Sequence, residues 1–239
     1  MQVSEALASG ARELGIALEP EMLEAFERYH QELDNWGKRV NLTAVEGEEE
    51  VAVKHFLDSL TCLKGADFRE GTTVVDVGSG AGFPGVPLKI VRPGIRLTLV
   101  EATRKRVEFL RHIVTVLGLA DVEVVWDRSE NVGHAPGHRE AYQVAVARAV
   151  ADLAILVELC LPLIEVGGTM LAQKGPEVAP EVARASAALA TMGAQVERII
   201  SLSLPRGHGD RTVVVVRKHS HTPEKYPRRP GVPERRPIR

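Results

Sequence analysis

The sequence predicts an α/β fold: a seven-stranded, mostly parallel sheet with helices on both faces and a helical extension at the N-terminus. Three features of the chain lead to this prediction. The β-branched stretch Val74–Val77 runs into a glycine-rich turn, strand-like and helix-like segments alternate from residue 72 onward, and the first 64 residues show helical apolar spacing. Such alternation favours a parallel sheet, because each crossover helix returns the chain to the same edge.

Length and composition fit one α/β domain with an appendage. The chain has 239 residues, of which 44% are hydrophobic, enough to bury a sizeable core. It shows no apolar run long enough to span a bilayer and no signal peptide at its start, so we expect a cytoplasmic protein that does not bind membranes. Cys62 and Cys160 lie in apolar helical segments and are expected to be free, buried thiols.

Residues 1–64 are predicted to form a helical unit. Apolar side chains recur at three- and four-residue steps, Pro20 suits the first turn of a helix, and Gly37 marks its end. A further helix is expected over residues 48–64, which carry apolar side chains at similar spacing. The unit is too long to be a lead-in to the sheet, so we treat it as separate from the domain that follows.

Seven strands and four helices are predicted between residues 65 and 217. The strands are expected at about 72–77, 96–100, 121–126, 143–147, 166–173, 195–202 and 211–217, and the helices at about 84–91, 104–118, 151–164 and 176–191. The segment 127–140 carries Gly133, Pro136 and Gly137 and is predicted to be a loop. No helix separates the last two strands, so these are expected to form an antiparallel pair at the edge of the sheet.

Residues 218–239 form a basic tail that is expected to contain neither a helix nor a central strand, because it holds five prolines. Residues 217–239 hold eight Lys and Arg against two acids, a net charge of +6, which leaves −8 for the rest of a chain whose total is −2. A basic tail on an acidic body predicts a polyanionic partner. A solvated tail without a partner is the alternative.

The glycine-rich turn predicts a nucleotide-like cofactor. Glycines at alternate positions let the backbone turn sharply and approach a ligand closely. Gly80-x-Gly82-x-x-Gly85 formally matches the dinucleotide fingerprint, whereas the strand-end carboxylate of Asp76 suits a cofactor with a sulfonium and an amino group. The spacing Asp-x-Gly-x-Gly-x-Gly, which starts at Asp76 and includes Gly78, resembles motif I of the class I S-adenosylmethionine (AdoMet) methyltransferases.

A second candidate anchor is Glu101, the acid at the end of the strand predicted at 96–100. It lies about as far downstream of the turn as an acid that meets a ribose diol. Both cofactor classes contain a ribose, so Glu101 does not separate them. The alternative is that Asp76 and Glu101 only cap helices.

Several separated segments resemble one family, in order along nearly the whole chain. These segments are Asn41-Leu42-Thr43-Ala44, Lys54 to Leu60, Asp76 to Leu88, Lys105-Arg106-Val107 with Phe109-Leu110, Ala147-Arg148-Ala149, Gln173-Lys174-Gly175 and Tyr226 to Gly231. Together they resemble the glucose-inhibited division protein B family, bacterial methyltransferases that place a methyl group on N7 of a guanine in 16S ribosomal RNA. One departure is Glu101, which stands where many members have Asp and preserves the ribose acceptor.

The resemblance implies an AdoMet-dependent enzyme with the class I methyltransferase fold, with S-adenosyl-L-homocysteine as its second product. The implied partner is 16S rRNA or the small ribosomal subunit, and we expect a monomer. The predicted cofactor residues are Asp76, Gly78, Gly80, Gly82, Phe83, Glu101, Ala102, Thr103, Ser129, Glu130 and Arg148. Gly78 and Phe83 would line the methionine and sulfonium end, Glu101 to Thr103 the ribose and adenine edge, and Ser129 and Glu130 the adenine.

The predicted catalytic residues are Arg148, Lys174 and Arg211, which follow or begin strands at the expected rim of the pocket. Guanine N7 holds a lone pair and no proton, so the reaction requires positioning and no general base. An arginine fork can hold a carboxylate or a guanine O6. The alternatives are an ion pair between Arg148 and Asp152, and surface charge for Lys174 and Arg211.

The predicted RNA contacts are His55, Lys174, Arg211, Tyr226, Arg228 and Arg229, with the tail as the main clamp, so that its removal leaves AdoMet binding intact. Ser59 lies on the same predicted helix as His55, and structural hydrogen bonds are favoured over a catalytic pair. His134 and His138 have no third ligand at suitable spacing, so no metal is expected.

Three other functions remain as alternatives: a small-molecule AdoMet methyltransferase, a nicotinamide-dependent oxidoreductase and a non-catalytic ribosome-binding protein. The basic tail and the N-terminal helices count against a small substrate, which needs neither. Asp76 and the antiparallel edge pair count against the oxidoreductase, since a dinucleotide fold more often has six parallel strands.

Overall fold

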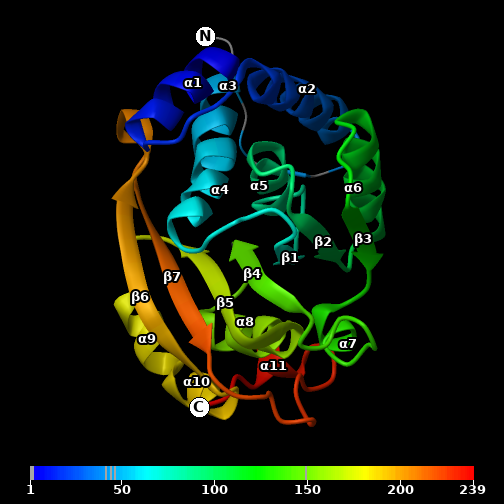
Figure 1. Ribbon diagram of the computed structural model, residues 1–239, viewed down its shortest axis with the longest axis vertical. Coiled ribbons are helices and arrows are strands. Elements are labelled where there is room, and N and C mark those ends of the chain that lie inside the picture. Colours follow the sequence, from blue (N-terminus) through cyan, green and yellow to red (C-terminus); the bar gives the residue numbers. More distant parts are fainter. Residues whose placement is uncertain (1–2, 41, 44, 46, 149) are drawn as a thin grey trace.

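The centre of the molecule is a seven-stranded sheet with the strand order β3-β2-β1-β4-β5-β7-β6 (Figure 1). The computed structural model describes residues 3–40, 42, 43, 45, 47–148 and 150–239. The strands are β1 Thr73–Val77, β2 Arg96–Glu101, β3 Val122–Trp126, β4 Tyr142–Arg148, β5 Ile164–Lys174, β6 Ala194–Ser203 and β7 Asp210–Lys218. All neighbours pair in parallel except β7, which runs antiparallel to both β5 and β6. The predicted seven-stranded sheet with its antiparallel edge pair is confirmed.

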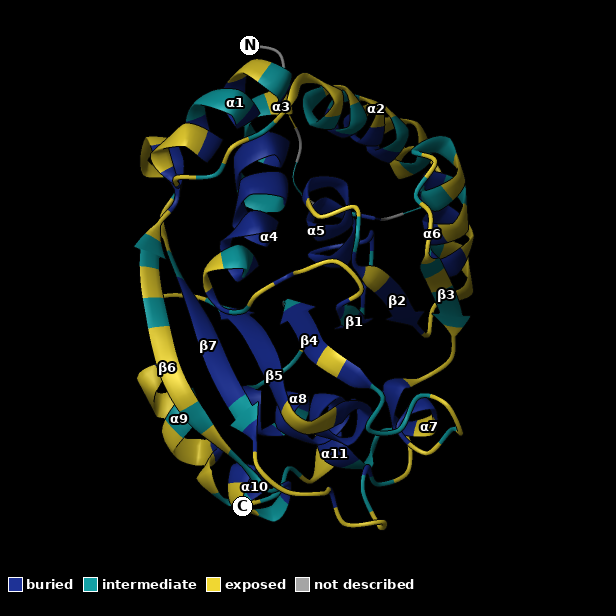
Figure 2. Ribbon diagram, viewed as in Figure 1, coloured by how far each residue is buried: buried dark blue, intermediate teal, exposed yellow. Residues whose placement is uncertain are grey.

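Alternate side chains of each strand enter two separate cores. In β1, Val74 belongs to the core on one face and Val75 to the core on the other, as the two-residue period of a strand requires. Figure 2 shows the central strands buried, while β6 at the edge is largely exposed. Both faces of the central strands are therefore covered, which explains their nearly continuous apolar sequences.

Helices cover both faces of the sheet. The helices α5 Gly85–Val91 and α6 Arg104–Val116 lie on one face, and α8 Leu153–Cys160, α9 Ala179–Arg184 and α10 Ser186–Thr191 lie on the other (Figure 1). The helix predicted over 176–191 is divided at Ala185, and the one predicted over 151–164 ends in a 3₁₀ turn, Leu161–Leu163. Pro162 stands in that turn, where an α-helix would lose a backbone hydrogen bond.

The N-terminal helices extend the layer that contains α5 and α6. They are α1 Val3–Glu13, α2 Pro20–Gly37, α3 Glu48–Val51, the π-helix η1 Ala52–Leu57, α4 Asp58–Leu60 and the 3₁₀ helix η2 Thr61–Lys64. The helix predicted over 48–64 is thus one helical run with a π segment in its middle. Side chains of α1 and α2 share one core with β1, β2 and β7, so the division of the sequence at residue 64 stays a prediction. Among the described residues, no helix is long and apolar enough to cross a membrane.

Two short helices correct the expectations from sequence. The segment predicted to be a loop contains α7 Ser129–Val132, and the tail contains α11 Val232–Arg235. The five prolines do not prevent the second helix, because Pro233 stands in its first turn, where the missing N–H costs nothing. Gly231 precedes it with φ of 76°, a left-handed conformation that glycine adopts without strain.

Candidate functional site

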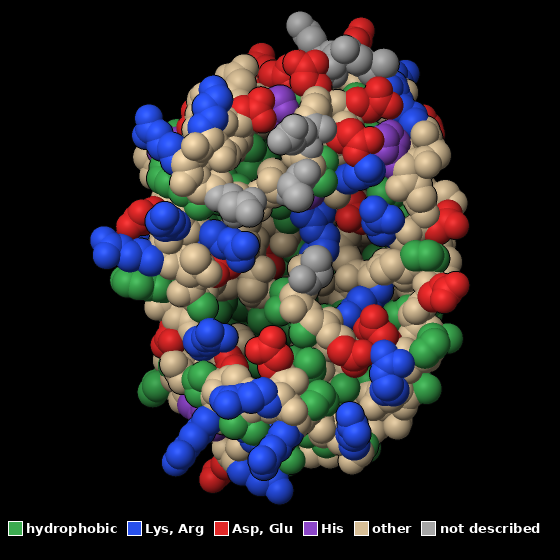
Figure 3. Space-filling view, turned by 180° about the vertical axis from the view of Figure 1, so that it is seen from behind, with side chains coloured by type: hydrophobic (Ala, Val, Ile, Leu, Met, Phe, Trp, Pro, Cys, Tyr) green, Lys and Arg blue, Asp and Glu red, His purple; other side chains and the backbone are tan. Residues whose placement is uncertain are grey.

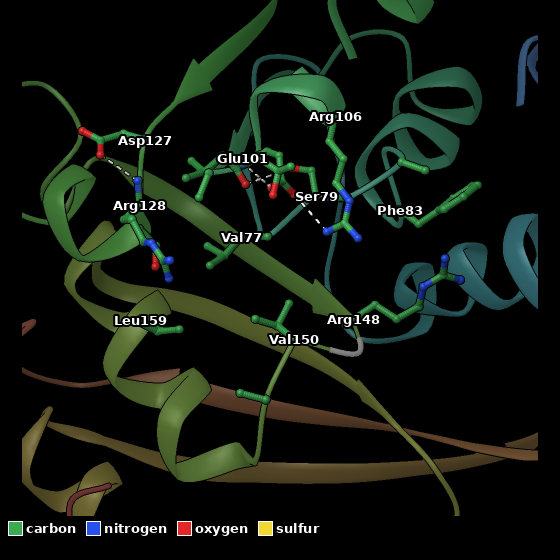
Figure 4. A pocket seen from close by; sticks show the side chains of 18 of the residues that line it. Val77, Ser79, Phe83, Glu101, Arg106, Asp127, Arg128, Arg148, Val150 and Leu159 are labelled. Carbon is green, nitrogen blue, oxygen red and sulfur yellow. Dashed lines mark hydrogen bonds and ion pairs between the residues drawn. The ribbon is translucent and has the colours of Figure 1, made fainter. Parts of the chain in front are cut away.

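A cavity of about 590 Å³ lies at the carboxyl ends of β1, β2, β3 and β4. Figure 4 shows Phe83 and Arg148 on one side of it, Asp127 and Arg128 on the other, and Glu101 between them. On the face seen in Figure 3 the molecule is hollowed near its centre, with Lys and Arg side chains among the groups on the rim. The carboxyl ends of parallel strands are where α/β proteins bind ligands, and the volume is that of a small-molecule site.

The turn after β1 forms one wall of the cavity. Gly78 has φ of 72°, and a Cβ there would lie 2.8 Å from Val150 across the cavity. Gly82 has φ of 98°, and a Cβ there would meet the hydroxyl of Tyr29 at 2.5 Å. Side chains at these two positions would strain the backbone and fill occupied space, so the turn requires glycine at both.

Tyr29 of α2 supports this turn from behind and was not predicted from sequence. Its hydroxyl donates to the carbonyl oxygen of Ala81 over 2.5 Å, and its ring stacks on Phe83 with centroids 5.4 Å apart. Burial raises the pKa of the Tyr29 hydroxyl, which keeps it a neutral donor. In the sequence, Tyr29 is one more residue in the buried stripe of a helix, and nothing there distinguishes it from a core aromatic.

Asp76 lies beneath the turn and does not line the cavity. Its Oδ2 accepts a hydrogen bond from the amide of Gly85 at 2.8 Å, so the carboxylate caps the start of α5. The other oxygen, Oδ1, is buried and lacks a hydrogen-bond partner. Burial raises the pKa of Asp76 to about 7, and the hydrogen bond from Gly85 opposes that rise. The predicted cofactor residues Asp76 and Gly82 thus shape the wall from behind.

Glu101 lines the cavity at the end of β2 and holds two loops together. Its Oε2 accepts from the amide of Gly80 at 3.0 Å, and its Oε1 accepts from the amide of Thr103 at 2.7 Å. The guanidinium of Arg106 lies 3.9 Å from Oε2. A carboxylate has about four acceptor positions, so capacity remains for hydroxyl donors on the cavity side.

Arg148, at the end of β4, is fixed by the π-helix. Its Nη1 donates to the carbonyl oxygens of Lys54 at 3.2 Å and His55 at 3.3 Å, and lies 3.4 Å from Oδ2 of Asp58. Its guanidinium also lies over the ring of Phe83, 4.7 Å from the centroid. The end of β4 is thus joined to the backbone of the π-helix through this one guanidinium.

His55 is held as a neutral ring beside Arg148. Its ring stacks on Phe83 with centroids 4.6 Å apart, and Nη2 of Arg148 lies 3.2 Å from its Nδ1. A guanidinium only donates, so Nδ1 is the acceptor and Nε2 carries the proton toward the hydroxyl of Thr43, 2.5 Å away. Burial, with Arg148, lowers the pKa of His55 to about 3. Ser59 donates to the carbonyl of His55 at 2.5 Å, so the structural interpretation of that pair is confirmed.

Asp58 is buried between two arginines. Arg148 and Arg211 approach its two carboxylate oxygens, each at 3.4 Å. Burial raises the pKa of Asp58, and the two guanidinium groups oppose that rise. The alternative in which Arg148 pairs with Asp152 is wrong, because Asp152 instead contacts Arg184 at 2.6 Å.

Lys174 and Arg211 lie outside the cavity wall. The ammonium of Lys174 donates to the carbonyl of Ala151 at 2.5 Å and lies 2.7 Å from Oε2 of Glu181. Arg211 reaches Asp58 and keeps about a quarter of its side chain exposed. Their roles toward a substrate stay predictions. Both lie near Arg148: Arg211 shares Asp58 with it, and Lys174 ends the strand that pairs with β4.

The opposite wall of the cavity joins α7 to the C-terminal segment. Ser129 and Glu130 line it, and Oε1 of Glu130 accepts from the amide of Gly231 at 2.9 Å. Pro233 and Glu234 of α11 also line the cavity. The sequence analysis missed this contribution, since only the path of the tail over α8 brings residues about a hundred positions apart together.

The predicted RNA residues of the tail differ in their surroundings. Arg228 donates to the buried Glu158 through Nε at 2.8 Å and Nη2 at 2.5 Å, whereas Arg229 is exposed. Tyr226 packs against the core of its face. Contacts with RNA stay predictions for all three residues. Arg229 is the arginine whose side chain is available to a partner, because Arg228 is paired with Glu158.

The chain matches one protein family over most of its length. A family model described as rRNA small subunit methyltransferase G (GidB) matches residues 22–212. Ribosomal RNA small subunit methyltransferase G of Pelotomaculum thermopropionicum is 52% identical over 236 residues, 99% of each chain. The protein of the same name from Roseiflexus sp. is 50% identical, over 97% of this chain and 98% of its own. Asn41, Ala44 and Ala149, which belong to the resembling segments, lie outside the described residues.

Solved structures share the fold at low identity. The structure of M. jannaschii TYW2 in complex with AdoMet has a TM-score of 0.53 and 13% identity, over 67% of this chain and 74% of that one. At this identity the likeness concerns the fold alone. The predicted class I methyltransferase fold is confirmed.

Proposed function

Because this chain belongs to the family of rRNA small subunit methyltransferase G (GidB), we propose that it transfers a methyl group from AdoMet to N7 of a guanine in 16S rRNA. The observation that carries the proposal is the cavity at the strand ends, which is bordered by the glycine turn and Glu101. A turn that admits no Cβ at Gly78 and a carboxylate with free acceptor positions are what a ribose-bearing ligand requires.

The residues present fit AdoMet in one orientation. Gly78 and Phe83 would border the methionine and sulfonium end, Glu101 would accept from the ribose hydroxyls, and Ser129 and Glu130 would meet the adenine. This order follows the wall of the cavity from Arg148 across to α7 (Figure 4).

The main requirement of this reaction is that the protein orient guanine N7 toward the methyl group. When bound, AdoMet supplies an electrophilic methyl group, and the lone pair of guanine N7 accepts it while the positive charge passes from sulfur to the base. Arg148, His55 and Phe83 contact one another at one end of the cavity, and this mutual support is consistent with a role in orienting the base. Orientation of this kind contributes up to about 7–11 kcal/mol to a rate enhancement.

His55 and Asp76 are not placed as general bases of the cavity. His55 has a lowered pKa and both ring nitrogens engaged. Asp76 lies behind the turn. Guanine N7 carries a lone pair and no proton, so its methylation requires no base from these two residues.

We further propose that the substrate is 16S rRNA, alone or in the small ribosomal subunit, and that the protein acts as a monomer in the cytoplasm. Arg211 and Lys174 lie beside the Arg148 end of the site, where an RNA strand would enter. Arg229 is exposed on the tail and stays a predicted phosphate contact.

Methyl transfer from radiolabelled AdoMet to unmodified 16S rRNA, followed by identification of the methylated base, tests the proposal. We expect 7-methylguanosine in the RNA, no methyl transfer to small-molecule acceptors and no binding of NAD. Gly78→Ala should abolish AdoMet binding, because its Cβ would lie 2.8 Å from Val150. Gly71→Ala is the matched control, since Gly71 has a similar φ of 78° but nothing within 4 Å of its Cβ. Tight NAD binding without AdoMet binding would overturn the proposal.

A further inference from the structure

The C-terminal segment 222–235 is anchored across the face of the sheet that carries α8. Arg139 donates to the carbonyl of Thr222 at 2.9 Å and to that of Tyr226 at 2.8 Å. His134 contacts the carbonyl of Pro227 at 2.7 Å. Figure 1 shows this part of the chain beside α8 and α7, far in sequence from both. Polar groups of the domain thus fix the backbone of the segment at several successive points.

A buried ion pair holds the middle of the segment. The carboxylate of Glu158 in α8 is fully buried and accepts from the amide of Arg228 at 2.9 Å as well as from its guanidinium. A fork held by two parallel bonds restricts rotation as well as distance. The anchor therefore determines where the next residues, 229–235, lie on the domain.

Beyond this anchor the segment reaches the cavity. The amide of Gly231 donates to Oε1 of Glu130, which is itself buried and lines the cavity. Pro233 and Glu234 follow and form part of the same wall. One oxygen of Glu130 is thereby occupied and its side chain is held in one rotamer, while the other oxygen remains an acceptor for a donor such as the amino group of a purine.

We propose that residues 230–235 are part of the cofactor site, as a positioning segment that fixes Glu130 and closes the cavity with Pro233 and Glu234. The inference rests on the proposed use of AdoMet and goes beyond it, because it assigns a C-terminal segment to the cofactor site. The affinity for AdoMet, and not only the affinity for RNA, then depends on the C-terminal residues. This reverses the expectation that loss of the tail leaves AdoMet binding intact.

Two variants and one control test the inference on the full chain. Deletion of residues 230–239 removes Gly231, Pro233 and Glu234 but keeps the Arg228 anchor. The double variant Pro233→Ala/Glu234→Ala keeps the whole backbone and both ends of the anchor. The control is Glu224→Ala, which removes one exposed carboxylate from the same segment outside the cavity.

Calorimetry with AdoMet and steady-state kinetics with 16S rRNA give the readouts. We expect the deletion to weaken AdoMet binding about tenfold, because it removes the hydrogen bond from Gly231 to Glu130 and the two side chains that line the cavity. The double variant should also weaken AdoMet binding, but by less. The KM for AdoMet should rise, whereas kcat at saturating AdoMet should not change. The control should bind AdoMet as the unaltered protein does.

Three outcomes decide the matter. An unchanged dissociation constant for AdoMet in both variants would overturn the inference while leaving the proposed function intact. Weaker RNA binding with unchanged AdoMet binding would return the segment to the role of an RNA clamp. Failure of the unaltered protein to bind AdoMet would overturn the proposed function itself. If the deletion lowers the melting temperature strongly, the double variant alone decides.

Discussion

Replacement of Arg228 by Ala separates the structural interpretation of the tail from its predicted role as an RNA clamp. Arg228 keeps 27% of its side chain exposed, but its partner Glu158 keeps none. Removal of one partner of a buried ion pair costs about 3–5 kcal/mol, because the other charge stays buried and unpaired. Here the backbone amide of residue 228 still bonds to Glu158 and water reaches the vacated space. We therefore expect the lower end, about 3 kcal/mol.

Thermal unfolding measured by circular dichroism gives the assay. For a chain of this size each kcal/mol lowers the melting temperature by about 2–4 °C, so Arg228→Ala should lower it by about 6–12 °C. Arg229→Ala is the control for stability, since Arg229 is exposed, and it should change the melting temperature little. The double variant Arg228→Ala/Glu158→Gln should recover part of the loss, because a buried amide costs less than a buried carboxylate. An unaltered melting temperature for Arg228→Ala, with a large loss of RNA affinity, would refute the reasoning.

Three further predictions follow from the site. Glu101→Gln should weaken AdoMet binding by about 1–3 kcal/mol, the range for hydrogen bonds to a charged group, and an unchanged dissociation constant in calorimetry would place Glu101 outside the site. Tyr29→Phe removes the donor to Ala81 and should destabilise the glycine turn by about 1–3 kcal/mol, seen as a lower melting temperature and weaker AdoMet binding. The pKa of His55 is about 3 in the folded protein and 6.5 ordinarily. Between these two pH values the unfolded state therefore binds more protons than the folded state. The contribution of neutral His55 to stability is consequently lost as pH falls from 6.5 toward 3. In urea unfolding, the free energy of unfolding of the unaltered protein minus that of His55→Gln should therefore fall with decreasing pH, by at most about 1.4 kcal/mol per pH unit; a pH-independent difference would contradict it.

Regular secondary structure was predictable because each strand carries its own signal. The stretch Val74–Val77 is β-branched, runs into a glycine turn and forms most of the inner strand β1, as predicted for residues 72–77. The antiparallel edge followed from the lack of a helix between β6 and β7. The π-helix Ala52–Leu57 carries no local signal in the sequence, and Arg148, which donates to two of its carbonyl groups, lies 93 and 94 positions away.

The candidate site was predictable where its residues follow strands. Gly78, Glu101, Ser129 and Arg148 all line the cavity, since parallel strands bring their carboxyl ends to one edge. Tyr29 and the α11 residues were missed, because they reach the cavity by tertiary packing that leaves no local pattern. Asp76 lies on its predicted strand. Its carboxylate was expected to contact the cofactor, but in the structure it accepts a hydrogen bond from the amide of Gly85.

The charge of the tail shows why a charge count alone misjudges function. Of its basic groups, Lys218 is fully buried and donates to Glu140, and Arg228 is bound to Glu158. These acids belong to the body, so part of the contrast between a body of −8 and a tail of +6 is neutralised within the fold. The charge left to attract RNA is correspondingly smaller, and Arg148 is likewise engaged by Asp58 and the π-helix. Arg148→Ala should therefore lower stability along with turnover, and so should Arg211→Ala, because Arg211 also approaches the buried Asp58. The exposed Arg229 is the better position at which to measure RNA binding alone.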